Sequence, residues 1–156
     1  MDSVVEEILK SNAEIKALAE KIAGERDIYF LGRGLDYFIA LEASLKLKEV
    51  SYIHSDAYAS GELKHGPIAL IDKKMPVVVV APDNNLMDKL VSNVEEVRAR
   101  GALLYIFASD RVEIREDKQC KVISLPECSE MLQPILFTIP LQLLAYHCAV
   151  INGTDV

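Results

Sequence analysis

The amino-acid sequence predicts a single α/β domain in which a mostly parallel sheet is covered by helices on both faces. Short runs of Val, Ile and Leu alternate with longer segments whose apolar residues recur at helical spacing. Strands that are buried on both faces are apolar along their whole length, which is the pattern of a parallel sheet. The length of 156 residues fits one domain with a substantial core. We therefore expect residues 1–156 to form one domain with right-handed crossovers.

The first part of the chain predicts two helices around one buried strand. Residues 2–23 repeat Val, Ile and Leu at helical spacing, and a glycine follows them. The run 28–31 is apolar throughout, which favours a buried strand, and the glycine-containing turn 32–34 ends it. Residues 36–50 are apolar on most sides and predict a largely buried helix. Residues 51–60 are polar and predict only a turn.

The second part of the chain predicts three more strands and an amphipathic helix. Residues 77–81 follow a proline and form the clearest strand of the sequence. Residues 86–100 predict an amphipathic helix that a glycine ends. Further strands are expected over 103–107 and 121–125. The residues themselves thus predict four strands.

A last helix over 130–151 is very apolar. Residues 131–151 contain no Asp, Glu, Lys or Arg and are long enough to span a bilayer. Prolines and polar residues within it make membrane insertion costly: Pro134, Pro140, Gln133, Thr138, Gln142 and His147. We expect no membrane span, but a helix buried on nearly every side, in the core or against another subunit.

Composition and charge narrow the function classes. The formal net charge is −7 and there is no Trp, which argues against a nucleic-acid-binding surface. Three cysteines lack any C-x-x-C spacing and are expected as buried thiols: Cys120, Cys128 and Cys148. The acidic, amphipathic start of the chain is unlike a signal peptide, so we expect a cytoplasmic protein.

The turn Gly32-Arg33-Gly34 is the start of a dinucleotide-binding pattern. Tyr37 stands where the third glycine would fall, and no acidic residue ends a strand about twenty residues later. A tight strand-to-helix turn is therefore the better interpretation. The helix N-terminus that follows still favours a nearby phosphate or carboxylate.

Three charged residues share one stripe of the helix over 36–50. Glu42, Lys46 and Glu49 follow one another at i, i+4 and i+7. Spacing alone is typical of a solvated surface pair of small energy. The other interpretation is that Lys46 and Glu49 lie in a cleft and act as acid and base.

His65 ends a short predicted helical piece over 62–65, just before Gly66 and Pro67. It follows Glu62 at i+3, but one such pair does not make a metal site, and no metal is expected. His65 is either a helix cap or a loop acid/base. His147, in the apolar last helix, is expected as a hydrogen-bonded packing residue.

The block from Phe30 to Asp72 resembles a known family: FLGRGLDYFIALEASLKLKEVSYIHSDAYASGELKHGPIALID. It is similar to the second sugar-isomerase (SIS) domain of the isomerising glutamine–fructose-6-phosphate aminotransferases. The similarity continues through MPVVVVAP, VEEVRARG, IPLQLLAYH and GTDV, so it covers nearly the whole chain. The ALE-x-x-LKLKE and GELKHGP blocks are long and specific.

This resemblance implies a three-layer sandwich of flavodoxin-like type with a five-stranded parallel sheet. It implies an enzyme that transfers ammonia from glutamine to fructose-6-phosphate and forms glucosamine-6-phosphate, on the way to UDP-N-acetylglucosamine, without metal or organic cofactor. Glu49 matches the base that moves a proton between the first two sugar carbons, and Lys46 the lysine beside it. His65 matches the histidine that assists ring opening in the neighbouring subunit's site, which implies a homodimer that binds hexose-6-phosphate.

The chain also departs from the whole enzyme. Met1-Asp2 supplies no N-terminal cysteine nucleophile, no Ser/Thr-rich phosphate loop is present, and the sequence ends at Val156, before the tail that carries the Schiff-base lysine. We expect a domain that is inactive alone. Two alternatives remain: a non-catalytic, regulatory sugar-phosphate-binding SIS domain, and a scaffold that recruits a partner through its apolar last helix.

Overall fold

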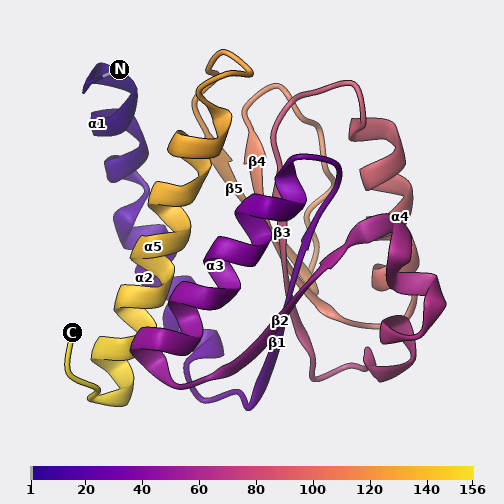
Figure 1. The fold of residues 1–156 in the computed structure, drawn as a ribbon, viewed down its shortest axis with the longest axis horizontal. Coiled ribbons are helices and arrows are strands. Elements are labelled where there is room, and N and C mark those ends of the chain that lie inside the picture. The colour runs from indigo at the N-terminus through magenta and orange to yellow at the C-terminus, as the bar shows by residue number, and fades with distance from the viewer. Residues whose placement is uncertain (1) are drawn as a thin grey trace.

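Five parallel strands form one sheet between two layers of helices (Figure 1). The computed structural model describes residues 2–156, so the expectation for Met1 lies outside the described residues. The elements in chain order are α1 (Asp2–Lys10), α2 (Asn12–Ile22), β1 (Asp27–Gly32), α3 (Asp36–Ser51), β2 (His54–Ala59), the 3₁₀ helices η1 (Ser60–His65) and η2 (Pro67–Leu70), β3 (Pro76–Ala81), α4 (Met87–Ala99), β4 (Leu103–Ser109), β5 (Cys120–Leu125) and α5 (Gln133–Asn152).

The strand order is β2-β1-β3-β4-β5. The chain first adds β2 on one side of β1 and then continues with β3 on the other side, so the order reverses between β1 and β3. This is the flavodoxin-like arrangement. Residues Val77–Val80 of β3 are fully buried, as a central strand covered on both faces requires. The predicted three-layer fold with a five-stranded parallel sheet is confirmed.

Strand β2 corrects the prediction of a turn over 51–60. Its sequence HSDAYA is polar, and it forms an edge strand that pairs with β1 from Asp27↔His54 to Gly32↔Ala59. Tyr58 packs edge-on against Tyr29, with ring centroids 4.9 Å apart. Backbone pairing with an apolar neighbour thus sets the strand, although its own side chains favour a loop.

The helix predicted over 2–23 is two helices, because the chain turns at Ser11. The Ser11 hydroxyl donates to the Ile8 carbonyl oxygen at 2.6 Å, and the Ser11 amide donates to the same oxygen at 3.0 Å. Such a local bond competes with the regular helical pattern. The break lets Ile8 and Ile15 both reach the core.

The sheet separates two apolar core layers. One face packs against α2, α3 and α5, through residues such as Phe30, Leu47 and Phe137. The other face packs against α4 and η1, through residues such as Leu63 and Val94. Helix α3 and segment η1 therefore lie on opposite faces of the sheet.

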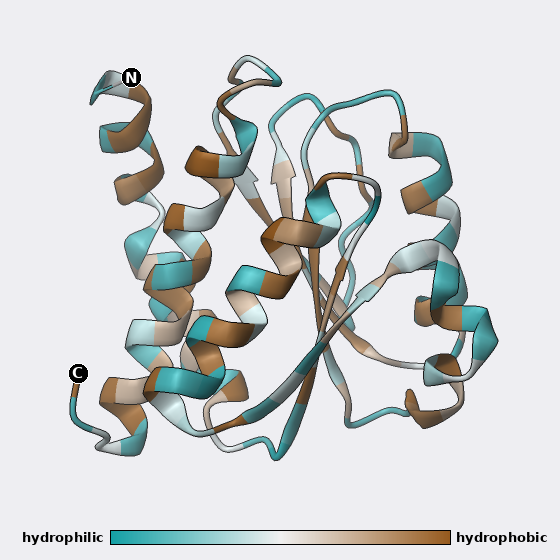
Figure 2. Cartoon of the chain, viewed as in Figure 1, coloured by the Kyte–Doolittle hydropathy of each residue, from teal (hydrophilic) through white to brown (hydrophobic). Residues whose placement is uncertain are grey.

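Helix α5 is buried on one side only. By length and composition α5 could cross a membrane, but the core helices of soluble proteins can be equally long and apolar. In its most apolar stretch, 44% of the residues are buried against the rest of the chain. Its exposed apolar residues include Ile135, Tyr146 and Val150, and the neighbouring helix α3 exposes Phe38 and Leu45. Figure 2 shows hydrophobic colouring along both helices. Burial on nearly every side within the core is therefore wrong, and burial of the outward side against another subunit stays a prediction.

Candidate functional site

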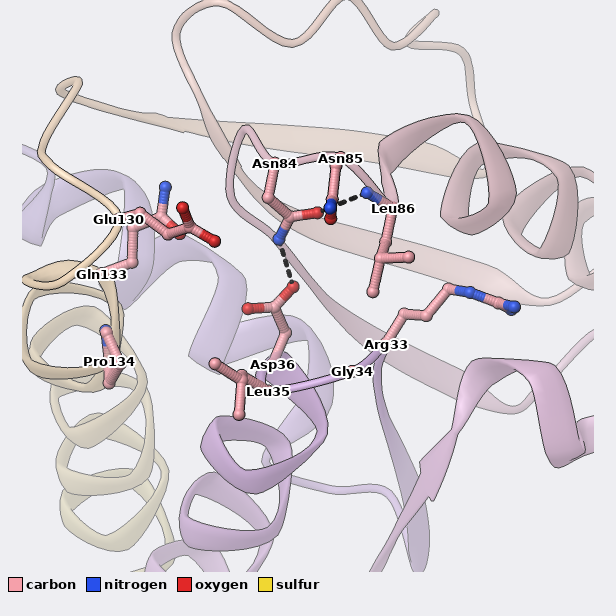
Figure 3. Close-up of a pocket in the computed structure, with 10 residues that line it drawn as sticks. All are labelled: Arg33, Gly34, Leu35, Asp36, Asn84, Asn85, Leu86, Glu130, Gln133 and Pro134. Atoms are coloured by element: carbon pink, nitrogen blue, oxygen red, sulfur yellow. Dashed lines mark hydrogen bonds between the residues drawn. The ribbon is translucent and has the colours of Figure 1, made fainter.

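A crevice opens at the carboxyl edge of the sheet, where the strand order reverses (Figure 3). Its volume is about 280 Å³. In open α/β sheets ligands bind at this place. The lining residues come from the loops after β1 and β3 and from the start of α5: Arg33, Gly34, Leu35, Asp36, Asn84, Asn85, Leu86, Glu130, Gln133 and Pro134.

Asp36 gives this crevice an acidic character. Its side chain begins α3, is 5% exposed, and accepts a hydrogen bond from Asn84 Nδ2 at 2.9 Å. Burial raises the pKa of Asp36 to about 6, the Asn84 hydrogen bond opposes this rise, and the charge of Glu130 adds to it. The anion at this helix N-terminus is thus the chain's own carboxylate. An incoming phosphate would meet Asp36 and Glu130, so the phosphate expected near this turn is disfavoured.

A second hollow of about 250 Å³ adjoins the first and shares Glu130 and Gln133 with it. It lies at the ends of β4 and β5, where Arg111 pairs with Glu127 at 2.6 Å. The Ser109 hydroxyl lines it, is buried, and has no hydrogen-bond partner within residues 2–156. The residue patterns assign no functional role to Ser109, Arg111 or Glu127. The one available signal is that Ser109 ends β4, Arg111 follows β4 and Glu127 follows β5.

The predicted pair Lys46 and Glu49 does meet, but away from both hollows. Lys46 Nζ lies 2.6 Å from Glu49 Oε2 and 3.9 Å from Glu42 Oε1. The hydrogen bond and charge of Glu49 raise the pKa of Lys46. The Glu49 side chain is 50% exposed near the C-terminal end of α3, about 20 Å along the helix axis from Asp36 at ~1.5 Å per residue. In the single chain the charged stripe faces solvent.

His65 stands apart from this pair. It ends η1, its side chain is 75% exposed, and its Nε2 lies 3.8 Å from Glu62 Oε2. Because η1 and α3 cover opposite faces of the sheet, one chain does not bring His65 to Glu49. Within residues 2–156 no group of three or more His, Cys, Asp or Glu side chains is placed to hold a metal.

Two further predictions concern side chains outside these groups. His147 Nε2 lies 2.7 Å from Asn12 Oδ1, which ties α5 to α2 and confirms the hydrogen-bonded packing role. Cys120 and Cys148 are buried free thiols, as expected, whereas Cys128 is only partly buried.

Comparisons with known proteins identify the family. The sequence profile of the SIS domain matches residues 21–152. The chain is 59% identical over 152 residues to the isomerising glutamine–fructose-6-phosphate aminotransferase of Aliivibrio fischeri, covering 97% of this chain and 25% of that protein. It is 54% identical over 156 residues to the enzyme of the same name from Escherichia coli K12, covering 100% of this chain and 26% of that protein.

A solved structure agrees with these relatives. The C-terminal domain of glucosamine-fructose-6-phosphate aminotransferase from Francisella tularensis matches with a TM-score of 0.92 and 49% identity, covering 99% of this chain and 43% of that one. The chain spans about a quarter of the length of the curated relatives it matches. By profile, sequence and structure, the chain belongs to the SIS domain family, and its counterpart is the C-terminal SIS domain of the isomerising glutamine–fructose-6-phosphate aminotransferases.

Proposed function

We propose that this domain supplies catalytic residues for the ketose–aldose isomerisation by which such an aminotransferase converts fructose-6-phosphate to glucosamine-6-phosphate. The observation that carries the proposal is the Lys46–Glu49 pair. An ammonium and a carboxylate are held 2.6 Å apart on one exposed helix face, inside the LKLKE block on which the resemblance to the family rests. The fold supports it, because the helix between β1 and β2 fixes both side chains on a rigid element.

The chemistry follows from these two groups. Isomerisation moves a proton between two adjacent sugar carbons. One carboxylate can serve both carbons, so Glu49 takes the proton from one carbon and returns it to the other. Negative charge develops on the neighbouring oxygen meanwhile, and the Lys46 ammonium stabilises it. A lysine is protonated at neutral pH, and the hydrogen bond and charge of Glu49 raise the pKa of Lys46 further.

We propose further that the working site forms between two copies of the chain. His65 and Glu49 lie on opposite faces of one sheet, so a second copy is needed to bring an imidazole to Glu49. The exposed apolar residues of α3 and α5 supply surface for such an association, and Leu45 lies next to Lys46 on α3. Apolar surface of this kind marks interaction sites. His65 of the second copy would then assist opening of the sugar ring.

The proposal also covers the ligand, the cofactor requirement and the activity of the isolated chain. The ligand is a hexose 6-phosphate in the cytoplasm, and no cofactor or metal is required. The acidic crevice beside Asp36 does not favour a phosphate, so the residues that bind the sugar phosphate would come from another part of the whole enzyme. The isolated chain is therefore expected to bind sugar phosphate weakly and to be inactive.

Replacement of Glu49 by Gln in the full-length enzyme tests the proposal. The expected result is a loss of about 10²- to 10⁴-fold in turnover, the usual contribution of a general base. Exchange of the C1 and C2 protons with deuterated solvent, followed by NMR, reports the step directly. Glu20→Gln, at an exposed glutamate of α2, is the matched control and keeps full turnover. Turnover within a few fold of wild type in Glu49→Gln would contradict the proposal and favour a non-catalytic sugar-phosphate-binding domain.

A further inference from the structure

The segment that carries His65 is fastened to helix α4. Leu63 of η1 is 1% exposed and packs in the same core layer as Leu90 and Val94 of α4. Beside it, Lys64 Nζ lies 2.9 Å from Glu96 Oε1 of α4. The side chain of the next residue, His65, extends into solvent, and its 3.8 Å contact with Glu62 lies within η1 itself. Segment η1 is thus fixed against α4 as far as Lys64, the residue before His65.

Arg33 makes a third link, which joins three elements. It leaves the turn after β1 and points away from the acidic crevice (Figure 3). Its Nη1 donates to Asn93 Oδ1 of α4 at 2.9 Å, and Asn93 is buried. The guanidinium also lies against the backbone of η1, because a Cβ added to Gly61 would stand 2.9 Å from Nη1. Arg33 therefore touches η1 and α4 from a loop at the sheet's centre.

The two polar links act on the same side of α4. Asn93 and Glu96 are three residues apart and so share one face of the helix. Asn93 holds the guanidinium against the start of η1, and Glu96 holds Lys64 near its end. A planar guanidinium with fixed donor geometry is better suited to this than a flexible ammonium.

We propose that Arg33 is a positioning residue for His65. It fixes the direction in which η1 presents the imidazole to a second copy of the chain, and it does not touch the sugar. The inference rests on the proposed function, because it matters for turnover only if His65 acts there. Nothing in the charge pattern of the turn 32–34 suggests this role, since the contacts with Gly61 and Asn93 arise from the tertiary fold.

A double-mutant cycle in the full-length enzyme tests the proposal, with Arg33→Met and His65→Ala singly and together. Arg33→Met alone is expected to lower turnover about 10- to 100-fold, the effect of a displaced catalytic group. In the His65→Ala background it should cause no further loss, because the group that it positions is gone. An equal loss in both backgrounds would overturn the proposal.

Two glycine variants and a hydrogen-exchange measurement separate the anchoring of η1 by Arg33 from the catalytic role of His65. Gly61→Ala pushes on the guanidinium and should lower turnover, whereas Gly24→Ala meets open space and should not. Hydrogen exchange of the amides of residues 61–65 should quicken in Arg33→Met and Gly61→Ala. Unchanged exchange in both would show that Arg33 does not hold η1. Full turnover of His65→Ala would instead refute the role of His65 in the proposed function, and the exchange result would still decide the anchoring.

Discussion

Replacing Asp36 by Asn should stabilise the domain at neutral pH and not at acid pH. Burial raises the pKa of this carboxyl from 3.8 to about 6, so the folded state holds the proton more tightly than the unfolded state. Stability is then greatest below about pH 4, falls as the pH rises to about 6, and is constant above. About two pKa units correspond to at most about 3 kcal/mol. Because the carboxylate borders a hollow that solvent reaches, about 1–2 kcal/mol is expected.

The asparagine removes this penalty because it is neutral and can still accept the hydrogen bond from Asn84. Urea unfolding followed by circular dichroism at several pH values between 4 and 7.5 measures the difference. The gain of Asp36→Asn over wild type should grow between pH 4 and pH 6 and then level off. Asp110→Asn, at an exposed aspartate after β4, should show no such trend. A gain independent of pH, or a loss at pH 7.5, would refute the reasoning.

Three further substitutions separate surface, core and buried polar contributions. Lys46→Met removes an exposed ion pair, so the urea midpoint should stay close to that of the wild type while turnover of the full-length enzyme falls. A clearly lower midpoint would make Lys46 structural. Phe107→Ala empties a fully buried site in β4 and should cost about 3–5 kcal/mol in urea unfolding; a cost below about 1 kcal/mol would contradict the core assignment. Ser55→Ala leaves the buried Ser44 hydroxyl without its hydrogen-bond partner at 3.0 Å and should lower the free energy of unfolding by about 1–3 kcal/mol. An unchanged urea midpoint would show that the Ser44 hydroxyl finds another acceptor.

The sequence predicts most of the fold because buried strands and helices leave a clear pattern of apolar residues in the sequence. The four apolar strands and the helices between them follow from composition and periodicity. Strand β2 escapes this reasoning, since its polar residues become a strand only by pairing with β1. The break at Ser11 also depends on one side-chain bond rather than on periodicity.

The candidate site is harder to predict from sequence patterns, because it depends on which loops the strand order brings together. Asp36 and Asn84 are far apart in sequence and meet only because β1 and β3 are neighbours. The Lys46–Glu49 pair is local and follows from helical spacing. That His65 lies across the sheet from this pair cannot be read from spacing, since it follows from the crossovers that place α3 and α4 on opposite faces.

In the proposed dimer, Glu49 of one chain and His65 of another complete one site. Mixed dimers of full-length enzyme, with Glu49→Gln in one subunit and His65→Ala in the other, test it most directly. One of the two sites then receives both changes and the other receives neither. We expect about half of the wild-type turnover from mixed dimers whose parent variants are inactive. Turnover no higher than that of the two parents would contradict it.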